Sequence, residues 1–211
     1  MKISDKISMI EINLDGFVMC PVLIRDGQDL ALVDAAFPDA FDALERGVEE
    51  SGYKLNQVTH VILTHQDWDH AGNIGKLRGR IPGLIVVAHE LEKPHITGEK
   101  PARLPPEYYC AVDKTIKHGD KLFGATVLHI PGHTDGHICL ALDGVLIAGD
   151  ALNAANGELA PPNPEYTDDM PQACKSLNRV LEYGDITTVL TYHGGRVTSN
   201  IKEALSKIAN A

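Results

Sequence analysis

The feature that most constrains the fold is a pattern repeated four times along the chain. A short apolar strand runs into a histidine or an aspartate, and a glycine lies close by. A single histidine or aspartate in such a place is usually a cap or a surface residue. Four such pieces in series instead indicate metal ligands delivered by strand ends. The four stretches are Val58–Gly72, Ile130–Thr134, Ile147–Asp150 and Leu190–Gly195.

The first of these stretches is the richest in candidate ligands. The segment HQDWDH, residues 65–70, offers four of them within six residues at the end of an apolar strand. Imidazole nitrogens and carboxylate oxygens are ligands that zinc, iron and manganese accept. Because alternate residues of an extended segment point the same way, we expect His65, Asp67 and Asp69 to converge. This density favours a metal site over a polar surface turn.

Strands dominate each half of the chain and helices punctuate them, which predicts an α/β fold. Two proline-rich stretches, His89–Asp120 and Asn153–Pro171, break this rhythm and are expected to be irregular, the first with short helical pieces. No repeat or linker divides the chain, so residues 1–211 are expected to form a single domain. The expected strands are Ser8–Leu14, Pro21–Ile24, Leu30–Val33, Val58–Leu63, Leu84–Ala88, Ala125–Ile130, His137–Leu142, Val145–Ala148 and Thr187–Thr191, and the expected helices are Asp39–Ser51, Pro171–Tyr183 and Ser199–Ile208.

Composition narrows the class of protein. Apolar residues make up 44% of the chain and charged residues 23%, which suits a globular core with a wet surface. The formal net charge of -10 repels phosphate backbones, so nucleic acid is not expected as a partner. The four cysteines form no CxxC pair and are expected to be reduced thiols. Since no signal-peptide pattern and no membrane-spanning apolar run is seen, we expect a cytoplasmic protein with no membrane partner.

In type and order, the ligand candidates resemble the signature of the metallo-β-lactamase superfamily, which is HxHxDH followed by a histidine, an aspartate and a histidine. The resemblance spans roughly Leu30 to Gly195, and Asp34 looks like the early structural aspartate of that family. It implies a four-layer αββα sandwich with two divalent metal ions at one edge.

The resemblance also implies a role for each ligand. A water or hydroxide between the two metal ions attacks the substrate, and Asp69 is both a ligand and the acceptor of a proton from this nucleophile. The implied ligands are His65, Asp67 and His133 for the first metal ion, Asp69, His70 and His193 for the second, and Asp150 as the bridge.

Two positions depart from the family pattern. Asp67 stands where a histidine is usual, and its charge makes the centre a weaker and harder Lewis acid, which favours manganese or iron relative to zinc. The flavodiiron branch similarly has a carboxylate there; the alternative is that Asp67 does not ligate. Residues 132–137 resemble the family's GHTPGH with Asp135 in place of proline. The resemblance implies that His137 is a structural hydrogen-bonding residue.

The chain shows no export signal, no helical carboxy-terminal domain like that of the glyoxalase-like thioesterases and no flavin domain like that of the flavodiiron enzymes. Within the family that it resembles, this leaves the compact lactonase-like and esterase-like hydrolases. We therefore expect a binuclear hydrolase that acts on a small-molecule ester, thioester or lactone. The alternative is a mononuclear iron oxidoreductase of the sulfur dioxygenase type, and a third class is a binding protein without activity. The two proline-rich stretches are expected to form the wall of the substrate pocket. A tyrosine from them or beside His193 is expected to assist catalysis, and the candidates are Tyr108, Tyr109, Tyr166 and Tyr192.

Overall fold

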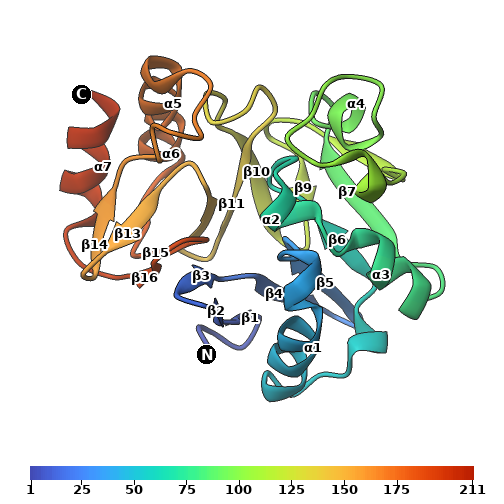
Figure 1. Cartoon of the computed structure of the whole chain (residues 1–211). Helices are drawn as coiled ribbons and strands as arrows, with labels where there is room; N and C mark the ends of the chain where they lie inside the picture. The colour runs from blue at the N-terminus through green and yellow to red at the C-terminus, as the bar shows by residue number, and fades with distance from the viewer. The chain divides into compact units, whose positions relative to one another are not determined.

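The computed structural model describes residues 1–211 and divides them into two compact units, Met1–Ile116 and Lys117–Ala211 (Figure 1). Each unit has one six-stranded sheet, one small two-stranded sheet and several helices. The expected α/β class, with two main sheets and flanking helices, is confirmed. The single domain expected for residues 1–211 stays a prediction.

In the first unit, the main sheet has the strand order β1-β4-β5-β6-β7-β8. The last four strands run parallel, and Val33, Ile62 and Val87 lie side by side in register. Parallel strands end at a common edge, so the residues that follow β5 and β6 meet there. The strands are β1 (Ile7–Met9), β4 (Val22–Asp26), β5 (Asp29–Val33), β6 (His60–Ile62), β7 (Ile85–His89) and β8 (Lys114–Ile116), beside the hairpin of β2 (Ile12–Leu14) and β3 (Phe17–Met19).

The helices of the first unit are amphipathic or very short. The longest is α1 (Phe41–Glu50), which buries Phe41, Leu44 and Val48 at the three- and four-residue spacing of one helix face. The others are α2 (Trp68–Ala71), α3 (Ile74–Arg80), α4 (Lys93–Ile96) and the 3₁₀ turns η1 (Pro38–Ala40), η2 (Leu55–Gln57) and η3 (Pro106–Tyr108).

In the second unit, the main sheet has the order β16-β15-β12-β11-β10-β9. Only β12 and β15 pair in parallel, and their register places Gly149 opposite Thr191. The strands are β9 (Lys121–Leu122), β10 (Ala125–His129), β11 (Ile138–Leu142), β12 (Val145–Gly149), β15 (Thr188–Thr191) and β16 (Gly195–Val197), with the hairpin of β13 (Asn153–Ala155) and β14 (Glu158–Ala160).

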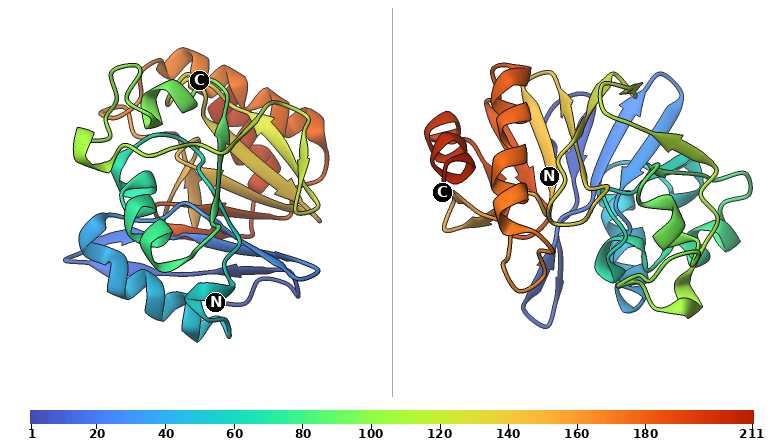
Figure 2. Two further views of the ribbon diagram at one scale, coloured as in Figure 1. Left: turned by 90° about the vertical axis from the view of Figure 1, so that its right-hand side faces the viewer. Right: turned by 90° about the horizontal axis from the view of Figure 1, so that it is seen from above.

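Three helices cover one face of this second sheet: α5 (Met170–Ser176), α6 (Asn178–Tyr183) and α7 (Ile201–Ala209) (Figure 2). The core between them joins Leu146 and Val189 of the sheet to Leu177, Val180 and Leu205 of the helical side. Neither unit contains a helix with the length and hydrophobicity of a membrane span. All four cysteines are free thiols.

Several expected elements differ in detail. The expected strand Ser8–Leu14 is two strands, and the expected helix Pro171–Tyr183 is divided into α5 and α6 at Leu177. The helix α3 was not expected, because Gly75 and Gly79 lower its helix propensity. The two stretches expected to be irregular contain the short strands β8, β13 and β14. Strands of only three residues carry too little periodicity to be recognised from sequence.

Candidate metal centre

A buried aspartate organises the ligand edge of the first sheet. Asp34 follows β5 directly, is 1% exposed and has a left-handed backbone with φ of 62°. Its Oδ1 accepts the backbone N–H of Thr64 at 2.8 Å, and its Oδ2 accepts the Thr64 hydroxyl at 2.8 Å. The same Oδ2 lies 2.9 Å from Nδ1 of His70. Asp34 thus holds the segment after β6 in place, as the structural role implied for it requires.

These contacts fix the tautomers of two candidate ligands. A carboxylate only accepts hydrogen bonds, so Nδ1 of His70 carries the proton that it donates to Asp34. The Thr64 hydroxyl gives its hydrogen to Asp34 and therefore accepts from Nδ1 of His65, at 3.0 Å. In the neutral form of both rings, Nε2 then carries the lone pair. Both imidazoles are fully buried, and their centroids are 4.0 Å apart.

The carboxylates of the HQDWDH segment lie beside these histidines. Asp67 Oδ2 is 3.4 Å from His65 Nε2, and Asp69 Oδ2 is 3.6 Å from His70 Nε2. The other oxygen of Asp67, Oδ1, is 2.8 Å from Nε of Arg103. The first unit therefore gathers two histidines, two carboxylates and one arginine in the residues next to the sheet edge.

The prediction that residues 65–70 are extended is wrong beyond Asp67. Residues Trp68–Ala71 form α2, because the carbonyl of Asp67 accepts the N–H groups of His70 and Ala71. Side chains therefore do not alternate through the segment. Asp67 lies with His65, whereas Asp69 lies with His70.

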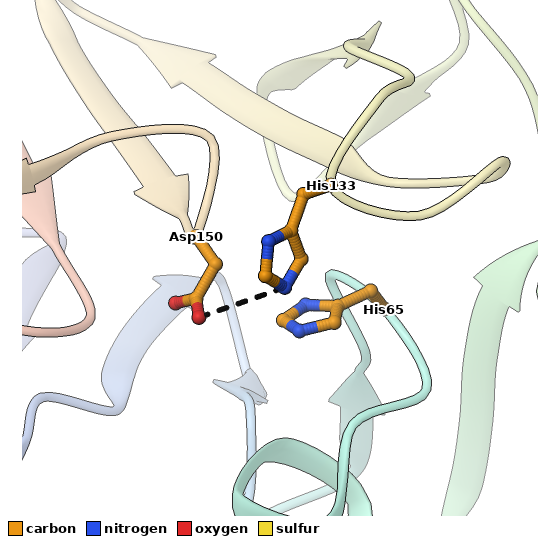
Figure 3. A group of neighbouring side chains, drawn as sticks. All are labelled: His65, His133 and Asp150. Atoms are coloured by element: carbon orange, nitrogen blue, oxygen red, sulfur yellow. Dashed lines mark ion pairs between the residues drawn. The ribbon is translucent and has the colours of Figure 1, made fainter. Parts of the chain in front are cut away.

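In the second unit, strand ends bring three candidate ligands together. Asp150 follows β12 and His193 follows β15, and these strands are parallel with Gly149 opposite Thr191. Strand β11 runs antiparallel to β12, so the loop that precedes β11 and contains His133 lies at the same edge. Asp150 Oδ2 is 3.7 Å from Nε2 of His133 and 3.6 Å from Nε2 of His193. Figure 3 shows the first of these pairs, with the imidazole of His133 facing the carboxylate.

His133 is held in the same tautomer as His65 and His70. The Thr167 hydroxyl donates to the carbonyl of Asn163 at 2.7 Å. It therefore accepts from Nδ1 of His133, at 3.2 Å. In the neutral ring, Nε2 carries the lone pair and faces Asp150.

His137 has the structural role that the resemblance implied. Its Nε2 accepts the backbone N–H of Asp150 at 3.1 Å, and the ring is fully buried. It therefore holds the residue that presents the carboxylate. The backbone carbonyl of Asp135, in the same loop, accepts a hydrogen bond from Nε2 of His129 at 2.8 Å.

The tyrosines proposed as catalytic helpers lie in different surroundings. Tyr192 is buried, and its ring is 5.0 Å from that of His193. Tyr108 lies 6.0 Å from Trp68 by ring centroids, and Tyr166 is 54% exposed. Tyr109 packs against Gly98. A catalytic hydroxyl among them stays a prediction.

Three supporting residues were not identified from the sequence: Thr64, Thr167 and Arg103. Thr64 directly precedes His65, and this adjacency is the signal that sequence reasoning overlooked. Thr167 and Arg103 lie 34 and 36 residues from the ligands they contact, His133 and Asp67, so no local pattern reveals them.

The donor set fits divalent metal ions. Ligating histidines characteristically donate their second ring N–H to a carboxylate or another oxygen, which fixes the ring and the coordinating tautomer. His65, His70 and His133 all have this arrangement, with Nδ1 held by an oxygen. Carboxylates accompany them in both units. Four histidines and three aspartates match the mixed nitrogen and oxygen ligands of zinc, iron and manganese.

Comparisons with known proteins agree on one family. The family model described as metallo-beta-lactamase superfamily matches residues 21–208. A hydroxyacylglutathione hydrolase of Rhizobium meliloti (strain 1021) is 33% identical over 182 residues, which cover 82% of this chain and 60% of that protein. This chain spans about three fifths of the length of the curated relatives first matched.

Solved structures share the fold. A metallo-beta-lactamase family protein from Thermus thermophilus matches with a TM-score of 0.78 and 23% identity, over 99% of this chain and 80% of that one. A protein crystallised in a di-iron-bound form matches with a TM-score of 0.68 and 23% identity, over 89% of this chain and 93% of that one.

Proposed function

The chain belongs to the metallo-β-lactamase superfamily, and from this premise we propose that it is a metal-dependent hydrolase of a small-molecule ester, thioester or lactone. Curated relatives named hydroxyacylglutathione hydrolase support hydrolysis as the reaction class. The activity named for those relatives is only a proposal for this chain, because this chain spans only about three fifths of their length.

One observation carries the proposal most directly. Three buried histidines have Nδ1 bonded to an oxygen acceptor, so that Nε2 of each neutral ring has the lone pair a metal ion requires. The Nε2 of the structural His137 accepts a backbone N–H, whereas each of these three Nε2 atoms lies beside a carboxylate, that of Asp67, Asp69 or Asp150. The proposed ligands are His65, Asp67 and His133 for a first metal ion, Asp69, His70 and His193 for a second, and Asp150 as the bridge.

The protein residues have separate tasks in this proposal. Two bound metal ions would supply a nucleophilic hydroxide at neutral pH and polarise the carbonyl oxygen of the substrate. Asp69 would accept the proton that this nucleophile releases. Asp34 keeps His70 in its coordinating tautomer. His137 fixes the backbone that presents Asp150.

The identity of the metals and the location of the protein are also part of the proposal. Zinc fits the histidines, and the carboxylates Asp67, Asp69 and Asp150 favour manganese or iron. The di-iron form of a structural relative agrees with an iron-loaded centre. Four free thiols agree with a reducing, cytoplasmic location. Neither nucleic acid nor membrane is proposed as a partner.

The test combines metal analysis with a substrate panel. We expect about two metal ions per chain by elemental analysis, and turnover of at least one ester, thioester or lactone that a chelator abolishes and added metal restores. Asp69→Asn should lower turnover by roughly 10²–10⁴-fold. Asp150→Ala should remove at least one metal ion.

Asp42→Asn, on the exposed face of α1, is the matched control and should behave as the parent protein does. Full metal content and full activity in Asp150→Ala would overturn the ligand assignment. Turnover that consumes oxygen and needs a single iron ion would instead support the sulfur dioxygenase alternative.

A further inference from the structure

Asp67 occupies a helix-capping position without using its side chain as a cap. Its backbone is extended, with φ of -64° and ψ of 151°, and its carbonyl accepts the N–H groups of His70 and Ala71 in α2. An aspartate at this position usually also accepts a helix N–H through its side chain. Here no such bond forms, and the carboxylate turns to two other groups.

The two groups are Arg103 and His65. Oδ1 of Asp67 lies 2.8 Å from the guanidinium Nε of Arg103, and Oδ2 lies 3.4 Å from Nε2 of His65. The Asp67 side chain is 12% exposed and that of Arg103 is 31% exposed. Oδ1 therefore forms an ion pair with the arginine, and Oδ2 faces Nε2 of His65, the nitrogen proposed to bind the metal ion.

The arginine changes the charge that Asp67 brings to the centre. An arginine stays protonated under all ordinary conditions, so the pair carries no net charge, as a neutral histidine would. At contact distance and partial burial, the guanidinium also weakens the carboxylate as a donor to a metal ion. The preference for manganese or iron expected from Asp67 alone is therefore opposed by Arg103.

We propose that Arg103 is a positioning residue that sets the affinity and the metal preference of the first metal site through Asp67. The inference rests on the proposed function, because it requires a metal ion at Asp67. Arg103 orients Oδ2 of Asp67 towards His65. It also offsets the negative charge of Asp67, which a histidine at this position would not bring.

The test measures metal binding without turnover, by competition with a chromophoric chelator for manganese and for zinc. Arg103→Gln should restore the full charge of Asp67 and raise the preference for manganese over zinc by about tenfold, the scale expected for one partly buried charge pair. Arg103→Lys keeps the charge and should stay near the parent ratio. Arg46→Gln, on the exposed face of α1, is the control for losing an arginine elsewhere.

A double-mutant cycle separates this role from a merely structural one. In an Asp67→Asn background, the further change Arg103→Gln should leave the metal ratio unmoved, because the charge it offsets is gone. An unchanged ratio in Arg103→Gln with full metal content would overturn the inference alone. An equal shift in the Asp67→Asn background would also overturn it, since Arg103 would then act by another route. A parent protein that binds no metal would overturn the proposed function as well.

Discussion

At the residue scale, the contacts of Asp34 show how one buried charge orders a ligand segment. Its two oxygens accept from the Thr64 backbone, the Thr64 hydroxyl and the His70 ring. A buried carboxylate is costly unless its lone pairs are used, and here three donors converge on it. Asp34 therefore supports the proposed centre by holding Thr64 and His70, although it is not one of the proposed ligands.

Replacing this carboxylate by an amide should damage both stability and metal binding. In Asp34→Asn the amide nitrogen would face Nδ1 of His70 and drive the ring proton to Nε2, where it competes with a metal ion. We expect the free energy of unfolding to fall by about 1–3 kcal/mol. We expect the affinity of the second metal site to fall by roughly 10–100-fold. Chemical denaturation and metal titration measure the two effects.

Asp15→Asn is the control for the Asp34 substitution. Asp15 has a similar left-handed backbone, with φ of 52°, and lies exposed in the β2–β3 turn. The Asp15→Asn substitution should change neither the free energy of unfolding nor the affinity of the second metal site. Parent-like metal affinity in Asp34→Asn would show that the tautomer of His70 does not depend on Asp34.

At the element scale, the turn between β15 and β16 places His193. Its carbonyl accepts the N–H of Ala154 at 3.0 Å, which ties the turn to the start of β13. Gly194 follows with φ of 103°, a conformation open mainly to glycine. A Cβ at this position would overlap the carbonyl oxygen of Ala154. The backbone at Gly194 and the backbone at Ala154 therefore lie so close together that only a glycine fits at position 194.

Gly194→Ala should displace this turn and the histidine before it. We expect the free energy of unfolding to fall by about 3 kcal/mol, from backbone strain and steric overlap together. Metal content should fall with it. Gly157→Ala is the matched control, because Gly157 also has a positive φ, of 79°, but open space around it. That variant should lose only about 1 kcal/mol and keep its metal. Equal losses in both would show that the overlap is relieved without moving His193.

Elements also show which parts of the molecule a sequence can reveal. The strands β6, β12 and β15 were predicted because each is an apolar run followed by a polar residue. The helical turn α2 after β6 was not predicted. Hydrophobic periodicity over six residues cannot distinguish an extended HQDWDH segment from one that begins extended and ends in a helical turn. The pairing of Asp67 with Arg103 was missed for a different reason: it is a tertiary contact between a ligand loop and a segment far along the chain.

At the scale of the whole molecule, each unit holds a half-buried histidine outside the ligand set. Burial lowers the pKa of His60 in the first unit. Burial likewise lowers the pKa of His129 in the second unit, although its contact with the Asp135 carbonyl works in the opposite direction. Both folded units therefore favour the neutral ring at a pH where the unfolded chain begins to take up protons.

Acid should destabilise the metal-free protein through these two rings. As the pH falls below about 6.5, the usual pKa of histidine, the unfolded state binds protons first and the free energy of unfolding decreases. Urea unfolding at pH 7.5 and pH 5.5, with a chelator present, measures the decrease. It should be smaller in a His60→Gln/His129→Gln variant, which has no proton to take up at either position. An undiminished pH dependence in that variant would assign the effect to other groups.

The parallel pairing of β12 with β15 has a consequence for the order in which the protein is made. Val145 pairs with Thr188, so this edge of β12 has no partner until the later strand leaves the ribosome. At the usual synthesis rates of about 5–20 residues per second, the nascent edge stays open for roughly two to ten seconds. An open edge strand is a template for pairing with other chains. Translation, and not the intrinsic speed of sheet formation, therefore sets how long this strand is exposed to its neighbours on a polysome.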